Sequence, residues 1–194
     1  LYKLIKIRRD IHKNPELGFE EYKTGKYIYQ YLKDLGIDNI KKNVGKTGLT
    51  ALIKGENQGK TIAFRSDMDA LPITEKTNLD FASSQEGIMH ACGHDGHIAM
   101  LLVAAKILQN KKAKLNGNVQ LIFQPAEESQ VGAKKMIEDG DLGNSGIDAI
   151  LALHLWMDFP AGEIRTRKGP IMASSDQITI NIKGKSAHGA MPHQ

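Results

Sequence analysis

Residues of the types that bind metals are concentrated in the segment 90–97, which has the sequence His-Ala-Cys-Gly-His-Asp-Gly-His. This segment holds three of the seven histidines and the single cysteine of the chain. Imidazole, thiolate and carboxylate groups together suit a Lewis-acidic divalent transition metal. A turn at Gly93 would let Cys92 and His94 face one point just before a helix. The cluster therefore predicts a metal site.

Other chemistries use the same residue types. A structural zinc knuckle normally pairs two C-x-x-C or H-x-x-H hooks, and the sequence has no pair of them. Cys92 could instead be a nucleophile with a nearby histidine as its base. It could also be a buried packing residue. These alternatives stay open at this point.

Further ligand-type residues follow three apolar runs that predict strands. Ligands bind beyond the carboxyl ends of the strands in open α/β sheets, so we expect these residues to meet there. Adjacent side chains diverge on an irregular strand end. One carboxylate of a neighbouring pair can therefore bind metal while the other acts as a general base. The residues are Asp67 and Asp69 after 61–64, Glu127 and Glu128 after 119–123, and His154 at the end of 149–153.

The elements that must position these residues alternate between strands and helices. Short apolar runs flanked by glycine or proline predict strands, and apolar residues at helical spacing predict helices. This alternation predicts an α/β fold with helices on both sides of the sheet. The predicted strands are 49–53, 61–64, 119–123 and 149–153, and the predicted helices are 1–14, 28–35, 98–108 and 133–137.

Three histidines have less certain roles in this pattern. We expect His12 at the end of the first helix and His97 at the start of the helix 98–108. Both are candidates to support metal ligands from behind. His154 ends an apolar run and could alternatively be a hydrogen-bonded core histidine.

The pattern changes near residue 177. Residues 177–183 alternate polar and apolar side chains, which predicts a strand with one solvent-facing side. We therefore expect a catalytic domain over residues 1–175 and the beginning of a smaller α+β domain over 176–194. The chain does not begin with Met and ends soon after this strand. We expect it to be a fragment.

Composition narrows the class of protein. The 194 residues are 41% hydrophobic and 25% charged, which is typical of a globular domain rather than a disordered or collagen-like chain. The longest apolar stretch, residues 98–105, is far shorter than the roughly 20 residues of a membrane span, and no secretory signal is visible. A single cysteine cannot form an internal disulfide, which favours a reducing compartment, the cytoplasm. The net charge of +4 is spread along the chain. We expect neither a nucleic-acid nor a membrane partner.

Four motifs in register resemble those of the aminoacylase and carboxypeptidase superfamily of dinuclear metallohydrolases. The similarity is strongest to its N-acyl-amino-acid amidohydrolase branch, which includes hippurate hydrolases, auxin-conjugate hydrolases and N-acetyldiaminopimelate deacetylases. Residues 8–21 also match an R-R-x-x-H-x-x-P-E-L-G-x-E-E element, so the resemblance covers nearly the whole chain. The four motifs are residues 65–72, 89–97, 124–128 and 152–154.

The resemblance implies a three-layer, zinc-peptidase-like catalytic domain with helices on both sides of a mixed sheet. It also implies two divalent ions of Zn, Mn, Co or Ni. Glu127 would be the general base, and Asp69 an acid supporting the ligands. The resemblance gives Asp67 no firm role. It also implies a further histidine ligand near the C-terminus of the full protein, beyond Gln194. The implied metal ligands in this chain are Cys92, His94, Glu128 and His154.

Residues 186–193 resemble the opening of the family's lid and dimerisation domain, although the usual form is nearer G-G-H-A-A-M-P-H. The resemblance implies a homodimer in which His188 stabilises the oxyanion, from a lid that can belong to the partner subunit. The implied reaction cleaves the amide bond of an N-acyl amino acid. Its products are an amino acid and a carboxylic acid. The alternative is a metal-binding member of the family that has lost turnover.

Overall fold

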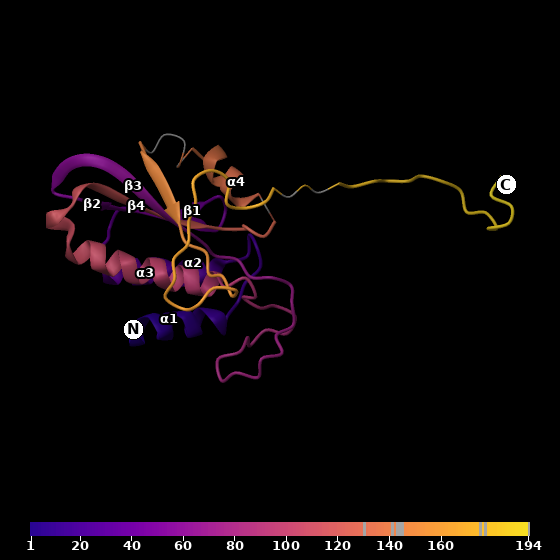
Figure 1. The fold of residues 1–194 in the computed structure, drawn as a ribbon, viewed down its shortest axis with the longest axis horizontal. Helices are drawn as coiled ribbons and strands as arrows, with labels where there is room; N and C mark the ends of the chain where they lie inside the picture. The colour runs from indigo at the N-terminus through magenta and orange to yellow at the C-terminus, as the bar shows by residue number, and fades with distance from the viewer. Residues whose placement is uncertain (130, 141, 143–145, 175, 177, 194) are drawn as a thin grey trace. The chain divides into compact units, whose positions relative to one another are not determined.

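Two compact units make up the chain, Leu1–Trp156 and Met157–Gln194. The computed structural model describes residues 1–129, 131–140, 142, 146–174, 176 and 178–193 (Figure 1). Each unit is treated by itself below. The domain boundary predicted between residues 175 and 176 falls inside the second unit and stays a prediction.

A five-stranded mixed sheet forms the centre of the first unit, with strand order β1-β2-β4-β3-β5. β3 runs parallel to both β4 and β5, whereas β2 is antiparallel to β1 and β4. The predicted mixed sheet is therefore confirmed. The strands are β1 (Ile40–Val44), β2 (Gly48–Lys54), β3 (Asn57–Asp67), β4 (Asn116–Gln124) and β5 (Ala149–Ala152).

Sequence patterns missed one strand of this sheet. β1 has the sequence Ile-Lys-Lys-Asn-Val, and its three central side chains are exposed. A strand at a sheet edge can pair through its backbone without an apolar run. Its pairing with β2, rather than a hydrophobic pattern, makes this segment a strand.

Helices cover both faces of the sheet, as the sequence predicts (Figure 1). Three helices pack on one face and the short α4 on the other. Within the described residues, no helix combines the length and apolar character that a membrane crossing requires. The helices are α1 (Tyr2–His12), α2 (Tyr22–Asp34), α3 (His94–Asn110) and α4 (Gly132–Glu138), with a short 3-10 turn at Lys112–Lys114.

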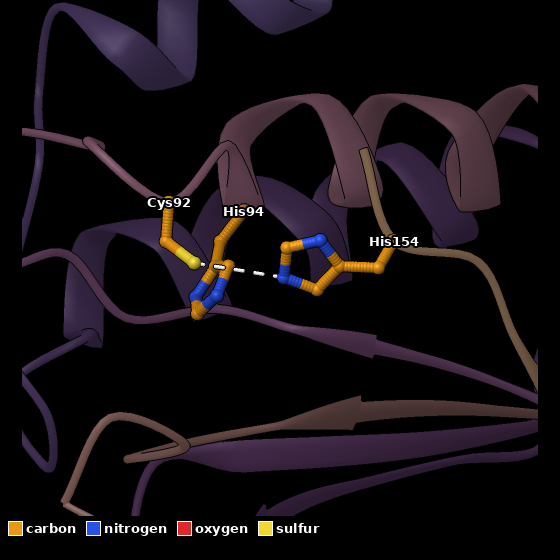
Figure 2. A group of neighbouring side chains, drawn as sticks. All are labelled: Cys92, His94 and His154. Atoms are coloured by element: carbon orange, nitrogen blue, oxygen red, sulfur yellow. Dashed lines mark hydrogen bonds between the residues drawn. The ribbon is translucent and has the colours of Figure 1, made fainter. Parts of the chain in front are cut away.

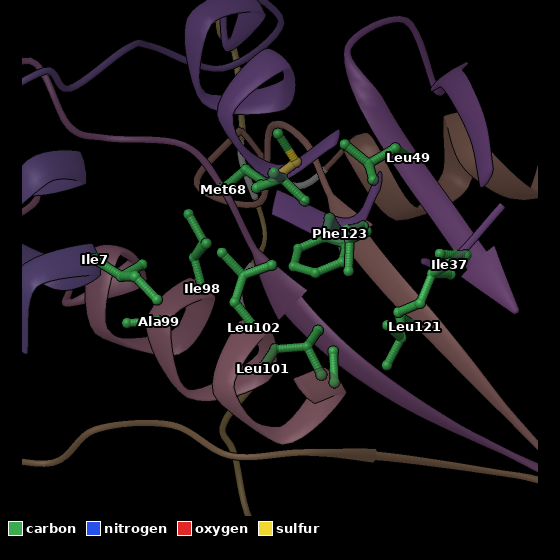
Figure 3. Close-up of a cluster of buried hydrophobic side chains, with 14 of the residues drawn as sticks. Ile7, Ile37, Leu49, Met68, Ile98, Ala99, Leu101, Leu102, Leu121 and Phe123 are labelled. Carbon is green, nitrogen blue, oxygen red and sulfur yellow. The ribbon is translucent and has the colours of Figure 1, made fainter. Parts of the chain in front are cut away.

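Alternate residues of β4 supply the two hydrophobic cores. Leu121 and Phe123 face the larger core, which contains Leu102 of α3 and the apolar sides of α1 and α2 (Figure 3). Ile122 points to the opposite face and packs in a smaller cluster with Met136 of α4. Both faces of the strand are buried, which explains why its sequence is a continuous apolar run.

The second unit contains no helix or strand within its described residues, 157–174, 176 and 178–193. The predicted strand 177–183 is therefore wrong over residues 178–183, and Gln177 lies outside the described residues. Ile178, Ile180 and Ile182 are each at least 78% exposed. An alternating pattern needs a neighbouring strand and a surface to cover, and these isoleucines have neither in this unit.

The burial of side chains in α3 predicts that two substitutions by alanine will lower the free energy of unfolding by very different amounts. Leu102 is fully buried, whereas Ile107 on the same helix is 51% exposed. We expect Leu102→Ala to lower the free energy of unfolding by about 2–5 kcal/mol, because it leaves a cavity in the larger core. Urea denaturation measures this change, with Ile107→Ala as the matched control. Equal losses for the two variants would contradict the assigned core.

Candidate metal centre

The turn Cys92–Gly93–His94 presents two predicted ligands to one point. Gly93 has a φ of 83°, a left-handed conformation that suits glycine, and α3 begins at His94. His154, two residues beyond β5, brings its Nε2 to 3.5 Å from Cys92 Sγ. One ligand atom from each of Cys92, His94 and His154 lies within 4.8 Å of the others (Figure 2). Three predicted ligands thus converge.

A hydrogen bond fixes which nitrogen of His94 faces this cluster. Nδ1 lies 2.9 Å from the main-chain oxygen of Asp69 and donates its proton there, since that oxygen can only accept. In the neutral imidazole, Nε2 therefore carries the lone pair. Burial alone lowers the pKa of His94, but the hydrogen bond to Asp69 and the nearby carboxylates raise it overall. The surroundings of this imidazole favour a positive charge.

Glu127 and Glu128 reach the same point from the loop after β4. Ala126 in this loop has a φ of 48°, which turns the chain sharply before the two acids. Glu128 Oε1 lies 3.7 Å and Glu127 Oε2 3.8 Å from His94 Nε2. The backbone N–H of Glu128 donates to Asp69 Oδ2 at 3.0 Å. Asp69 thus contacts both predicted ligands, as a supporting acid must.

Two buried atoms of this cluster show that the residues fit a cation. His94 Nε2 and Glu128 Oε1 lie 3.7 Å apart, and neither has a hydrogen-bond partner among the described residues. Unpaired buried polar atoms are costly. A divalent ion would satisfy both atoms, and sulfur, nitrogen and oxygen donors together suit a transition metal. The donor set therefore fits a divalent transition metal.

Asp67 and His97 form a hydrogen-bonded pair beside the cluster. His97 Nδ1 donates to Asp67 Oδ1 at 2.6 Å, and His97 Nε2 accepts the backbone N–H of Leu155 at 2.9 Å. Both nitrogens of His97 are therefore engaged, although the residue lies near enough to be a ligand. The bond to Leu155 instead holds the backbone next to His154. His97 lies in the first turn of α3, which begins four residues before the predicted start at residue 98.

The charge of Asp67 is strongly stabilised in this position. Burial alone would raise its pKa, but the His97 hydrogen bond and the charges of His94 and Arg65 lower it to about 2. Arg65 lies 3.1 Å from Asp67 and 4.0 Å from Glu127. Asp67 is thus an anion at neutral pH that adds negative charge to the cluster.

The surroundings of Cys92 oppose a nucleophilic role. Burial raises the pKa of the thiol to about 12, and the carboxylates of Glu128, Glu127 and Asp67 add to the shift. A nucleophilic cysteine needs an electropositive site that lowers this pKa. Without a metal the thiol would stay protonated at neutral pH. The convergence of Cys92 with His94 and His154, together with this raised pKa, favours a metal ligand over a cysteine nucleophile.

Glu127 has the surroundings that a general base needs. Burial and the Asp67 carboxylate raise its pKa above the ordinary value, against the opposing effect of His94 and Arg65. Its side chain is still 39% exposed, so water can reach it. A carboxylate with a raised pKa accepts and returns a proton more readily near neutral pH.

One predicted residue of the first unit, His12, lies apart from this cluster. His12 is the last residue of α1, as expected, and its Nδ1 lies 2.8 Å from Asp95 Oδ2. It belongs to none of the candidate metal groups among the described residues. His188 belongs to the second unit, so its predicted role at the metal centre stays a prediction.

The sequence patterns assign no role to Glu21, which contacts the loop after β4. Its Oε1 accepts the backbone N–H of Ala126 at 2.8 Å, although 105 residues separate the two. The side chain is fully buried. In the sequence, Glu21 stands out only as the last residue of the element 8–21. That element does not indicate that Glu21 contacts Ala126.

Comparison with known proteins links this geometry to a family. The chain is 50% identical over 190 residues to the N-acetyl-L-cysteine deacetylase of Bacillus subtilis, covering 98% of this chain and 45% of that protein. It is 42% identical over 193 residues to the N-acetyldiaminopimelate deacetylase of Bacillus cytotoxicus, covering 98% of this chain and 50% of that protein. The chain thus spans about half the length of these relatives.

A solved structure supports the same assignment. The YxeP protein of Bacillus subtilis, described as a dinuclear metal-binding peptidase of the M20 family, superimposes with a TM-score of 0.79. It is 48% identical, and the match covers 83% of this chain and 45% of that one. The model of peptidase family M20/M25/M40 matches residues 63–192, which include the whole cluster described above. On this match, the chain belongs to peptidase family M20/M25/M40.

Proposed function

We propose that the protein is a metal-dependent amidohydrolase that cleaves N-acyl amino acids into an amino acid and a carboxylic acid. One observation carries the proposal. The unpartnered, buried Nε2 of His94 lies at the meeting point of a thiol, a second imidazole and two carboxylates. The names of the two deacetylase relatives support an acylated amino acid as the substrate class.

We assign the metal ligands to four side chains: Cys92, His94, Glu128 and His154. When bound, two divalent ions of Zn, Mn, Co or Ni supply Lewis-acid chemistry, which activates water and polarises an amide carbonyl. Ligation requires a reduced Cys92, which supports a reducing compartment such as the cytoplasm. The dinuclear character of the YxeP structure supports two ions.

Glu127 is the proton carrier in this proposal. Its partly exposed carboxylate takes a proton from the attacking water and delivers it to the nitrogen of the leaving amine. Its raised pKa suits both transfers. Glu128, the next residue, has its carboxylate oxygen 3.7 Å from His94 Nε2, and Asp69 holds its backbone N–H.

Asp69 keeps His94 in the tautomer that ligation needs. The main-chain oxygen of Asp69 accepts the Nδ1 proton, which leaves the Nε2 lone pair for the metal. The same residue therefore orients a nitrogen ligand and an oxygen ligand. The proposed supporting role of Asp69 consists of these two hydrogen bonds.

The second domain and the dimer belong to the proposal as well. We propose that residues 176–194 begin a lid and dimerisation domain, and that His188 stabilises the tetrahedral oxyanion. In a homodimer His188 would act at the partner's site. The similarity of residues 186–193 to the family's lid sequence supports this assignment.

Glu127→Gln should abolish hydrolysis while leaving the metal content unchanged. Glutamine has nearly the same shape but cannot accept the proton of water, so we expect kcat to fall by about 10²-fold or more. Turnover of a panel of N-acyl amino acids and metal analysis measure the two effects in the full-length protein. Glu138→Gln, on the exposed side of α4, is the matched control. Near-normal turnover in Glu127→Gln would remove Glu127 from the mechanism, and a metal-loaded wild type without turnover would favour the non-catalytic alternative.

Cys92→Ser should weaken metal binding before it affects stability. A neutral hydroxyl replaces a thiolate, so we expect the affinity for Zn²⁺ to fall by about 10–100-fold or more. Competition with a chelator measures the affinity, and thermal unfolding of the metal-free protein provides the control. Unchanged affinity would show that Cys92 is a packing residue. Activity that survives complete metal removal but is lost on alkylation would revive the cysteine nucleophile.

Mixing two inactive variants tests the role of His188. If His188 acts across a homodimer, Glu127→Gln and His188→Ala subunits should together regenerate activity, because a heterodimer contains one site with both wild-type residues. Activity after subunit exchange is the measurement, and each variant alone is the control. No recovery despite demonstrated exchange would contradict action across the dimer.

A further inference from the structure

Ala126, the residue before Glu127 and Glu128 in the loop after β4, has an unfavourable backbone conformation. Its φ of 48° lies in the left-handed region, which residues with a Cβ seldom occupy. Its carbonyl oxygen accepts the backbone N–H of Gly132 at 3.2 Å and the hydroxyl of Ser129 at 3.1 Å. A Cβ added to Gly18 would lie 3.1 Å from both Cα and Cβ of Ala126. The surrounding structure therefore holds this conformation.

A buried carboxylate completes these contacts. Glu21, at the start of α2, accepts the Ala126 N–H through Oε1 and the hydroxyl of Thr47 through Oε2. Its side chain is fully buried, and no basic side chain in the described part of the chain pairs with it. A buried charge without a cation is costly. The hydrogen bonds from Ala126 and Thr47 offset part of that cost.

The backbone on either side of Glu127 is held by a different carboxylate. Glu21 accepts the N–H of Ala126 on one side, and Asp69 accepts the N–H of Glu128 on the other. The backbone between these bonds sets where the Glu127 side chain points. Loss of the Glu21 bond would free Ala126 to leave the left-handed region while Glu128 stayed attached to Asp69.

We propose that Glu21 is a positioning residue that orients Glu127 by holding the backbone N–H of Ala126. The proposal rests on the function proposed above, since it assigns Glu21 to the reaction through Glu127. In this proposal the acceptor oxygen of Glu21, rather than its negative charge, holds the Ala126 N–H. A side chain of equal size without that oxygen should therefore fail, whereas an uncharged side chain that keeps it should succeed.

Two substitutions of similar volume separate these cases. Glu21→Gln keeps an oxygen for Ala126, and its amide N–H₂ can donate to Thr47, so we expect kcat within about threefold of wild type. Glu21→Met fills the space without an acceptor. We expect its kcat to fall by about 10–100-fold with little change in KM or metal content, because a small displacement of a catalytic group has this effect. If Glu21→Met does not fold, Glu21→Ala tests the same loss.

Glu16 provides the matched control. Its carboxylate accepts the backbone N–H groups of Lys23 and Thr24 at the start of α2, but its side chain makes no hydrogen bond to the loop after β4 among the described residues. We expect Glu16→Ala to lower the melting temperature and leave kcat near wild type. An equal loss of kcat in Glu16→Ala would show that general destabilisation of α2, not the Glu21 contact, causes the effect.

Amide hydrogen exchange in the metal-free protein gives a second readout. We expect exchange at Ala126 to be at least about tenfold faster in Glu21→Met than in wild type or Glu21→Gln, because its N–H loses the acceptor. Unchanged exchange and unchanged kcat in Glu21→Met would overturn the proposal. A large loss of kcat in Glu21→Gln would also overturn it. If wild type hydrolyses no N-acyl amino acid, the proposed function fails, and unchanged exchange would separately overturn the Glu21 contact.

Discussion

Asp69 holds two sides of the candidate metal centre at once. Its main-chain oxygen accepts the Nδ1 proton of His94, and its carboxylate accepts the backbone N–H of Glu128. The first bond decides that the His94 lone pair faces the cluster, and the second places the Glu128 carboxylate opposite it. His94 Nε2 and Glu128 Oε1 then lie 3.7 Å apart, and neither atom has a hydrogen-bond partner among the described residues. This arrangement is unfavourable unless a cation lies there, and it links the packing of the chain to metal chemistry.

The mixed sheet brings Asp69 to this position. β3 is parallel to both β4 and β5, so the carboxyl ends of these three strands lie at one edge. Asp67, the last residue of β3, pairs in register with Gln124 at the end of β4. The acidic loops and His154 therefore emerge side by side, and the turn before α3 adds Cys92 and His94. Antiparallel β1 and β2 extend the sheet on the other side of β4 and contribute none of these groups.

Much of this arrangement could be predicted because it depends on local patterns. Continuous apolar runs identified four of the five strands, and the density of histidine and cysteine identified the segment before α3. The edge strand β1 lacked such a pattern, since backbone pairing with β2 forms it. The wrong strand at 178–183 shows the converse, because alternation alone does not supply a partner. The Glu21–Ala126 bond joins residues 105 apart in the sequence and could be found only from the folded chain.

The central claim is that one metal centre uses the sulfur of Cys92 together with nitrogen and oxygen donors. X-ray absorption spectroscopy of the full-length protein loaded with Zn²⁺ tests it directly, since sulfur scatters differently from nitrogen and oxygen. We predict a sulfur atom at about 2.3 Å from zinc together with nitrogen or oxygen atoms at about 2.0–2.2 Å. A spectrum with nitrogen and oxygen neighbours alone would contradict the assignment of Cys92 as a ligand.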